Sequence, residues 1–202
     1  LVDVPIIAAG GIGTGKTMLA AFILGASGGV GTAAIQIAKE IGAIVIAAAS
    51  SNDKLDYCKK MGADYCINYT KENIKEKVKN YTKGMGSNVI YDPVGDKFSE
   101  PALRSIAWEG RYLVVGFAAG EIPKIPLNIT LLKGCQIVGV FWGAWVGQFP
   151  DENKKNFDEL FSLHAVGKIN PEVSQKYSLA DSADAFTHLA NRKAKGKVII
   201  NM

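Results

Sequence analysis

The chain has 202 residues, of which 48% are hydrophobic and 21% are charged, and its formal net charge is +4. A chain of this size suits one α/β domain with a sizeable core and at most a small appendage. Its lysines and arginines are dispersed rather than clustered on one face, which argues against nucleic-acid binding.

Three cysteines, Cys58, Cys66 and Cys135, show neither CxxC spacing nor nearby histidines. This pattern argues against a bound metal and predicts free thiols in a reducing cytoplasm. No apolar stretch is long enough, without interruption, to span a membrane. The first residues lack the charged start of a signal peptide. They also lack an initiator methionine, as a fragment of a longer protein would.

The first predicted unit, residues 1–21, contains a glycine-rich motif. Gly10 to Thr17 match GxxxxGK[ST] between a predicted strand and a predicted helix. In a P-loop, backbone N–H groups cradle phosphates, Lys16 reaches the outer phosphates and Thr17 holds Mg²⁺. Asp92 could then serve as a Walker B carboxylate. This pattern gives one alternative, an ATP- or GTP-binding domain, although nothing else in the chain indicates a hydrolase.

From residue 22 onward, short β-rich runs alternate with helical patterns. The runs are nearly continuous in apolar residues, which is typical of parallel strands covered on both faces. Strands are predicted at 22–26, 44–49, 64–69, 88–94, 111–117, 136–142 and 197–202. Helices are predicted between the first two strands, ending at Gly42, and at about 52–61, 71–82, 97–107, 151–164 and 180–192. Residues 118–134 are predicted to be a loop, and Ser178 with Asp181 forms a predicted capping box.

This alternation predicts an α/β fold, a Rossmann-type doubly wound parallel sheet in three α/β/α layers over residues 22–202. The turn Gly25–Gly31 lies where the first strand should pass into the first helix. Glycine there lets a pyrophosphate approach the backbone at a helix N-terminus, where free N–H groups and the helix dipole favour negative charge. Such turns also occur merely to pack a helix closely on a strand, but the flanking elements strengthen the functional interpretation.

The segments LGASGGVGTAAIQIAKEIGA, GADYCINY, NVIYDPVG, ALRSIAWEGRYLVVGFAAGEIP and VGVFWGAW carry a family resemblance. Residues 24–202 resemble the cofactor-binding half of zinc-independent medium-chain dehydrogenase/reductases, and NADPH:quinone oxidoreductases in particular. Residues 1–26 instead resemble a fragment of an FMN-dependent barrel of the nitronate monooxygenase type. The chain therefore resembles a junction of two genes at residues 24–26.

The resemblance implies a site for NADP. Around the pyrophosphate it places Gly25, Ser27, Gly28, Gly29, Val30 and Gly31. Facing the adenosine ribose and its 2′-phosphate it places Ser50, Lys54 and Tyr69, and beside the nicotinamide it places Gly116, Phe117, Phe141 and Trp142. For Phe141 and Trp142 the alternative interpretation is packing in the core or in an interface, and for Tyr69 it is an aromatic residue at the end of a strand. The second strand ends in Ala48-Ala49-Ser50-Ser51, without the acid that selects NADH, which favours NADPH.

The resemblance implies hydride transfer from NADPH to a quinone or another carbonyl or enone acceptor. We expect this activity to be impaired here, because the family's first domain would supply one side of the substrate cleft. The sequence names no catalytic residue. A nucleotide-binding module without turnover is the second alternative. A small-molecule substrate is expected, the resemblance is compatible with a homodimer, and no nucleic-acid or membrane partner is expected.

Overall fold

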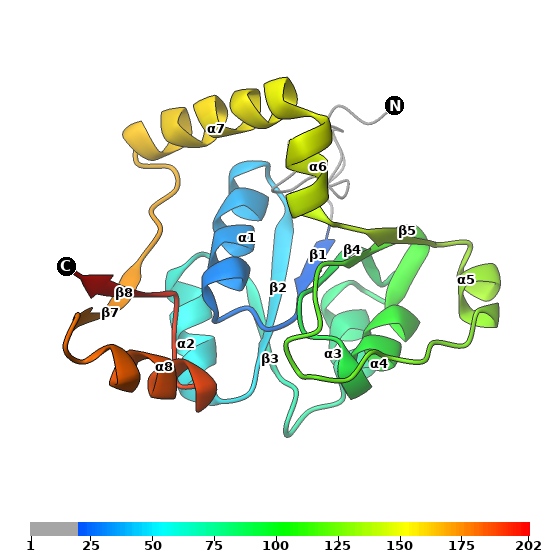
Figure 1. Ribbon diagram of the computed structural model, residues 1–202. Helices are drawn as coiled ribbons and strands as arrows, with labels where there is room; N and C mark the ends of the chain where they lie inside the picture. Colours follow the sequence, from blue (N-terminus) through cyan, green and yellow to red (C-terminus); the bar gives the residue numbers. More distant parts are fainter. Residues whose placement is uncertain (1–19) are drawn as a thin grey trace.

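The computed structural model describes residues 20–202. Its centre is a parallel six-stranded sheet in the order β3-β2-β1-β4-β5-β6 (Figure 1). The strands are β1 (Ala20–Ile23), β2 (Ile44–Ala49), β3 (Tyr65–Asn68), β4 (Ser87–Asp92), β5 (Ile106–Val114) and β6 (Gln136–Gly139). The order in which strands are added to the sheet reverses between β1 and β4. This position is the topological switch point, where open α/β sheets bind their ligands.

Helices cover both faces of the sheet, as predicted. They are α1 (Gly29–Glu40), α2 (Asn52–Lys60), α3 (Ile74–Tyr81), α4 (Ser99–Arg104), α5 (Asn128–Lys133), α6 (Trp142–Gln148), α7 (Pro150–Ala165) and α8 (Ser182–Ala190), with a short 3₁₀ turn η1 (Asp96–Phe98). Successive strand residues point to opposite faces. Phe22 packs in a core with α3 and α4, whereas Ala21 and Ile23 pack in a second core with α1 and α2. Burial on both faces explains the nearly continuous apolar runs.

The central strand β1 forms between β2 and β4, as the sequence predicted. Phe22 pairs with Ile46 on one side and Ile90 on the other. The strand covers Ala20–Ile23 rather than residues 22–26, because Gly25 adopts a left-handed conformation (φ 58°) that begins the turn into α1. The prediction of a helix or loose extension over 13–20 falls almost wholly outside the described residues.

Several element boundaries differ from the predictions. Residues 128–133, predicted as loop, form α5, which ends at Gly134 in the left-handed conformation. The predicted strand 136–142 stops at Gly139 and is followed by α6. The predicted helix 97–107 ends at Arg104, and β5 already begins at Ile106. Elements as short as α5 and α6 span too few turns to show a helical period.

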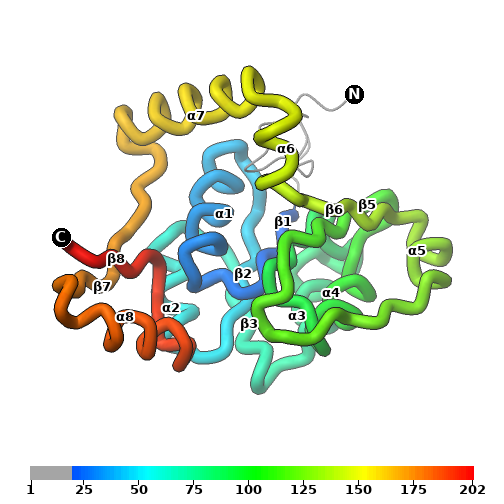
Figure 2. The backbone as a smooth tube through the Cα atoms, viewed as in Figure 1, coloured from blue at the N-terminus to red at the C-terminus, as the bar shows by residue number. Residues whose placement is uncertain are grey.

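A second, two-stranded parallel sheet follows the main one. It consists of β7 (Val173–Ser178), which the sequence did not predict, and β8 (Lys197–Asn201). Figure 2 shows this sheet and α8 beside α2, while α7 crosses above α1. Ser178 and Asp181 do form the predicted side-chain hydrogen bonds, although α8 begins at Ser182. A single parallel bridge, Gly28 to Gly196, links the second sheet to the turn before α1.

Candidate functional site

The resemblance gives Gly25, Gly28 and Gly31 as the three fingerprint glycines of the turn, and two of them are required by the fold itself. Gly25 has φ 58°, and a Cβ atom there would lie 2.7 Å from Cγ2 of Val94. A Cβ atom on Gly31 would lie 2.6 Å from both Cα of Ala26 and the carbonyl oxygen of Gly25. Both distances are shorter than real carbon contacts allow, so these glycines let the turn close and let α1 approach β1.

Gly28 differs from the other two glycines. A Cβ atom there would have only one neighbour within 4 Å, the carbonyl oxygen of Gly25 at 3.7 Å, so packing does not demand glycine. Gly28 is the N-cap of α1 and provides no side-chain cap, and the first turn holds no acidic residue. Helix N-termini of this kind attract anions through their N–H groups and dipole. Ser27, which is buried, and the adjoining Gly29 and Val30 complete this turn.

A cluster of positive side chains lies beyond the carboxyl end of β2. The Lys54 ammonium donates to the carbonyl oxygen of Arg192 at 2.6 Å and to the Ser50 hydroxyl at 3.4 Å. Burial lowers the pKa of Lys54, and the charge of Arg192 lowers it further; Lys195 acts in the same direction, against Asp53. An anion placed beside Lys54 would offset the repulsion that the ammonium experiences from its positive neighbours.

The sequence pattern predicts Lys54 as part of this cluster but does not predict Arg192 and Lys195. Asp53, the first acid after β2, forms an ion pair with Lys195 at 2.5 Å, so these two charges partly offset each other and Lys54 and Arg192 supply the excess positive charge. The only signal was the run Arg192-Lys193-Ala194-Lys195, which was interpreted as part of a dispersed positive charge. Its contact with α2 depends on how the C-terminal segment folds back, and no local pattern reveals that.

The predicted residue Tyr69 lies at the same edge of the sheet, where its backbone N–H donates to the carbonyl of Ala49 at 3.2 Å. Its ring packs against Phe98 with the ring centres 4.5 Å apart. Tyr69 also borders the core formed with α3 and α4. The Tyr69 ring therefore packs against Phe98 beside the end of β2, and its predicted role towards the ribose stays a prediction.

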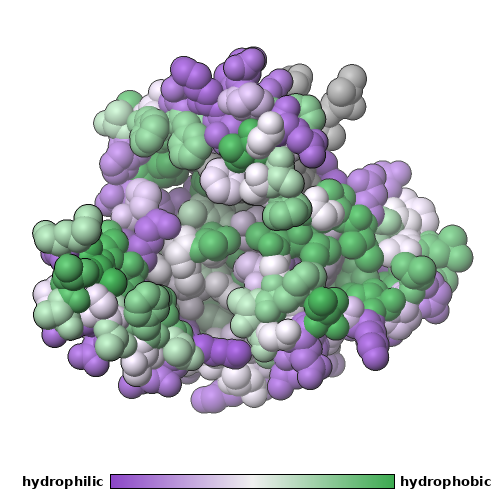
Figure 3. Space-filling model, in the orientation of Figure 1, coloured by the Kyte–Doolittle hydropathy of each residue, from purple (hydrophilic) through white to green (hydrophobic). Residues whose placement is uncertain are grey.

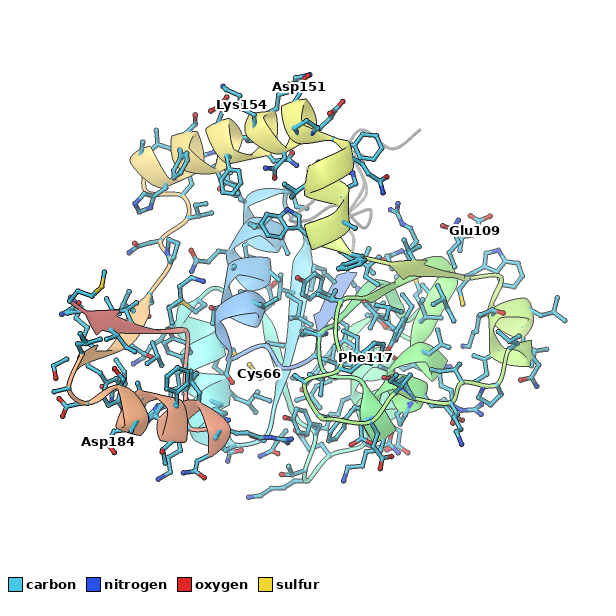
Figure 4. All side chains as sticks on the ribbon, in the orientation of Figure 1. Cys66, Glu109, Phe117, Asp151, Lys154 and Asp184 are labelled. Atoms are coloured by element: carbon cyan, nitrogen blue, oxygen red, sulfur yellow. The ribbon has the colours of Figure 1, made fainter. Side chains whose placement is uncertain are left out.

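On the other side of the switch point, Gly116 and Phe117 follow β5. The Gly116 N–H donates to the carbonyl oxygen of Asp92 at 3.3 Å, which holds this segment against the end of β4. Figure 4 shows Phe117 on the loop after β5, and its side chain is exposed. Gly95 lies directly under it, since a Cβ atom there would be 2.8 Å from Cδ1 of Phe117.

Phe141 and Trp142 follow β6, the next strand of the sheet. The Val140 N–H donates to the carbonyl of Val114 at 2.9 Å, so these aromatic residues leave the sheet at the same edge as Gly116. The Phe141 side chain is 79% exposed, and Trp142 begins α6 and is also exposed. The interpretation that these two residues pack in the core of the chain is therefore wrong.

The Walker B interpretation of Asp92 is contradicted. Its carboxylate is only 2% exposed and accepts four hydrogen bonds from protein donors. A carboxylate used in this way has no free oxygen for Mg²⁺. The remaining residues of that motif, Gly10–Thr17, lie outside the described residues.

The strand order and the glycine turn at the start of α1 together define a Rossmann fold. Residues 29–162 match the zinc-binding dehydrogenase family, and the chain belongs to that family. The family's description names zinc. Among residues 20–202, no group of three or more His, Cys, Asp or Glu side chains is placed to hold a metal ion.

The chain is similar to known oxidoreductases. It is 39% identical over 188 residues to a quinone oxidoreductase-like protein 2 homolog of Nematostella vectensis, covering 93% of this chain and 51% of that protein. It is 32% identical to an NAD-dependent alcohol dehydrogenase of Sulfolobus acidocaldarius, over 89% of this chain and 49% of that one. The crystal structure of Escherichia coli quinone oxidoreductase complexed with NADPH superposes with a TM-score of 0.86 at 28% identity, over 99% of this chain and 64% of that one.

The chain thus spans about half the length of these curated relatives. The similarities support the resemblance of residues 24–202 to quinone oxidoreductases. They give no support to the resemblance of residues 1–26 to a nitronate monooxygenase. Within residues 20–202, none of the helices has the length and apolar character needed to cross a bilayer.

Proposed function

We propose that this chain is the cofactor-binding half of an oxidoreductase that transfers hydride from NADPH to a quinone or another carbonyl or enone acceptor. The observation that carries the proposal is the cluster of Lys54, Arg192 and Lys195 beside Ser50. In Rossmann folds an acid at this place binds the ribose hydroxyls of NAD, whereas positive charge accommodates a 2′-phosphate. The bound cofactor would supply the hydride, and the chain would bind and orient it.

The residues present fit both phosphate groups of such a cofactor. The open N-terminus of α1 at Gly28 suits a pyrophosphate. The positive cluster suits the 2′-phosphate, and Gly116, Phe117, Phe141 and Trp142 lie at the edge where a nicotinamide would follow. A relative named NAD-dependent makes NADH the competing cofactor, so the experiment must compare the two.

The test compares NADPH and NADH binding to the wild type, Lys54→Ala and Arg192→Ala. Each loss of a charge-assisted hydrogen bond, worth about 1.5–3 kcal/mol, should weaken NADPH binding by roughly tenfold to a hundredfold. NADH binding should change little, because NADH lacks the 2′-phosphate. Lys59→Ala is the matched control: Lys59 lies on the same helix, is exposed and only pairs with Asp56. Equal losses for both cofactors in Lys54→Ala would contradict the assignment to NADPH.

The pH dependence adds a check with a defined sign. The pKa of Lys54 is lowered, so its charge is lost at a lower pH than that of an ordinary lysine. As pH rises through that pKa, the preference for NADPH over NADH should fall. Lys54→Arg keeps its charge over this range and should retain the preference.

We further propose a cytoplasmic protein with a small-molecule substrate, no metal, and no nucleic-acid or membrane partner. The domain that binds the cofactor would begin at Ala20 of β1 rather than at residue 22, and the preceding residues would be an extension. A homodimer is proposed through β6. β6 is one of the two edge strands of the sheet, the other being β3. Ile137 on β6 is exposed, as are Leu131 and Leu132 on the adjoining α5. An open apolar edge invites pairing with a second copy. Light scattering of the purified chain tests this proposal, and a monomeric mass would contradict it.

A further inference from the structure

Asp92 ends β4, directly beside the switch point of the sheet. One carboxylate oxygen accepts the backbone N–H groups of Val94 and Gly95, at 2.8 and 2.9 Å. The other accepts the Ser99 hydroxyl at 2.8 Å and the Tyr112 hydroxyl. Ser99 begins α4 and Tyr112 lies on β5, so one buried side chain joins the loop after β4, a helix and the neighbouring strand.

The backbone of the same residue holds the segment after β5. The carbonyl oxygen of Asp92 accepts the N–H groups of Val115 and Gly116, at 3.0 and 3.3 Å. Gly95, whose N–H the carboxylate binds, lies in contact with Phe117. Asp92 therefore fixes the segment 115–117, which would lie beside a nicotinamide, and the loop 93–95, which contacts Phe117.

The hydrogen bonds of Asp92 fix the orientation of the loop as well as stabilising the fold. A buried carboxylate is costly unless it is fully hydrogen-bonded, and apolar replacements of buried polar groups are often neutral for stability. The four groups around the Asp92 carboxylate all donate hydrogen bonds to it, two to each oxygen, so both oxygens are fully satisfied. Burial and the Asp92 charge raise the pKa of the Tyr112 hydroxyl, which keeps it protonated as a donor. The directional bonds define one orientation of the loop, which hydrophobic packing would not.

We propose that Asp92 is a positioning residue for the nicotinamide half of the cofactor. The inference rests on the proposed function, since it assumes that a nicotinamide dinucleotide binds at this edge. Asp92 touches neither cofactor nor substrate; it acts through Gly95, Gly116 and Phe117. The adenosine half, bound near Lys54 and Ser50, does not depend on it.

The test separates the two halves of the ligand. Binding of NADPH is compared with binding of adenosine 2′,5′-bisphosphate, which carries only the adenosine end, in the wild type, Asp92→Ala and Asp92→Asn. The wild type should bind NADPH more tightly than the bisphosphate, because the nicotinamide half adds contacts. In Asp92→Ala that advantage should fall on the order of tenfold, with the bisphosphate bound as in the wild type. The change in nicotinamide fluorescence on binding should shrink in parallel.

Asp92→Asn should largely rescue binding. The amide oxygen can accept both backbone N–H groups, while the amide nitrogen can donate to the Ser99 and Tyr112 hydroxyls, which also accept. Ser87→Ala is the matched control. Ser87 lies at the other end of β4 and its buried hydroxyl donates to the carbonyls of Ala20 and Val89, at 2.8 and 2.7 Å. Ser87→Ala should lower the melting temperature without changing the advantage of NADPH.

The inference is overturned if Asp92→Ala weakens both ligands by the same factor, or weakens neither. If Asp92→Ala does not fold, Tyr112→Phe provides the same test, because it removes one of the four donors to Asp92. It should reduce the advantage of NADPH over the bisphosphate by a smaller factor. An unchanged advantage in Tyr112→Phe would then overturn the inference. A wild type that binds neither ligand refutes the proposed function itself. A wild type that binds both, with ratios that no Asp92 or Tyr112 variant alters, refutes only the role of Asp92.

Discussion

At the scale of single residues, the three fingerprint glycines have different tasks. Gly25 and Gly31 are needed because a Cβ atom would collide with neighbouring atoms, whereas a Cβ atom on Gly28 would make only one ordinary contact. A sequence pattern treats the three alike, since it records only where a side chain is missing. The sequence therefore predicted the turn correctly, and only the packing around it separates a glycine that closes the fold from one that leaves room for a ligand.

This difference predicts opposite results for two alanine substitutions. Gly31→Ala forces a backbone contact and should lower the free energy of unfolding by about 1–3 kcal/mol. Gly28→Ala, at an extended N-cap position, should change it by less than about 1 kcal/mol but weaken NADPH binding by on the order of tenfold or more. Chemical denaturation and fluorescence titration of the two variants measure these quantities. Wild-type NADPH affinity in Gly28→Ala would show that no pyrophosphate approaches this residue.

At the scale of elements, the regular strand–helix units were predictable and the C-terminal segment was not. The strand β2 has a strong apolar pattern because both of its faces are covered. By contrast β7, with the sequence VSQKYS, is largely exposed and shows no such run. The contacts that bring Arg192 to Lys54 and Gly196 to Ser27 join residues far apart in the sequence. Periodicity describes local structure, so it could predict the glycine turn but not this part of the site.

The junction between α2 and the second sheet gives an element-scale prediction. Gly196 has φ 60°, and a Cβ atom there would collide with the Tyr57 hydroxyl. That hydroxyl is buried and finds no hydrogen-bond partner among residues 20–202; burial, then the Glu172 charge, raises its pKa to about 12. Gly196→Ala should cost about 1–3 kcal/mol of stability. Tyr57→Phe should add about 1 kcal/mol, because it removes an unpaired buried group.

The double variant Gly196→Ala/Tyr57→Phe should recover part of the loss, because the smaller phenylalanine leaves space for the new methyl group. Thermal unfolding of the four proteins in one cycle provides the measurement. Strict additivity of the two changes would mean that the hydroxyl is not what excludes a side chain at residue 196.

At the scale of the whole molecule, apolar surface is concentrated in the C-terminal third and around α5. Figure 3 shows apolar side chains over α8 with β7 and β8, and again over α5. Phe161, Phe186 and Leu189 are all exposed, and no residue of α7 is buried. A cavity of about 400 Å³ lies between α1 and α7. Exposed apolar area of this extent is typical of a surface that another domain or subunit covers.

We therefore expect this chain to bind NADPH but to reduce quinones poorly. Its relatives are about twice as long, and the nicotinamide side here ends in the exposed residues Phe117 and Phe141. A ring that faces water loses the positioning that can contribute about 7–11 kcal/mol to a reaction between bound partners. NADPH fluorescence on binding, followed by its absorbance with a simple quinone, measures both steps. Turnover equal to that of an intact quinone oxidoreductase would show that one half suffices.

The bond between Gly196 and the glycine turn also bears on the order in which the protein is made. The Gly196 N–H donates to the carbonyl oxygen of Ser27 at 2.8 Å. The turn that follows β1 is therefore held by a residue that is synthesised after all six strands of the main sheet. A nascent chain on the ribosome can pair β1 through β6 while Arg192 and Gly196 are still missing. Cofactor present during translation therefore meets an incomplete site at first, and would stabilise the protein most once the C-terminal segment has emerged.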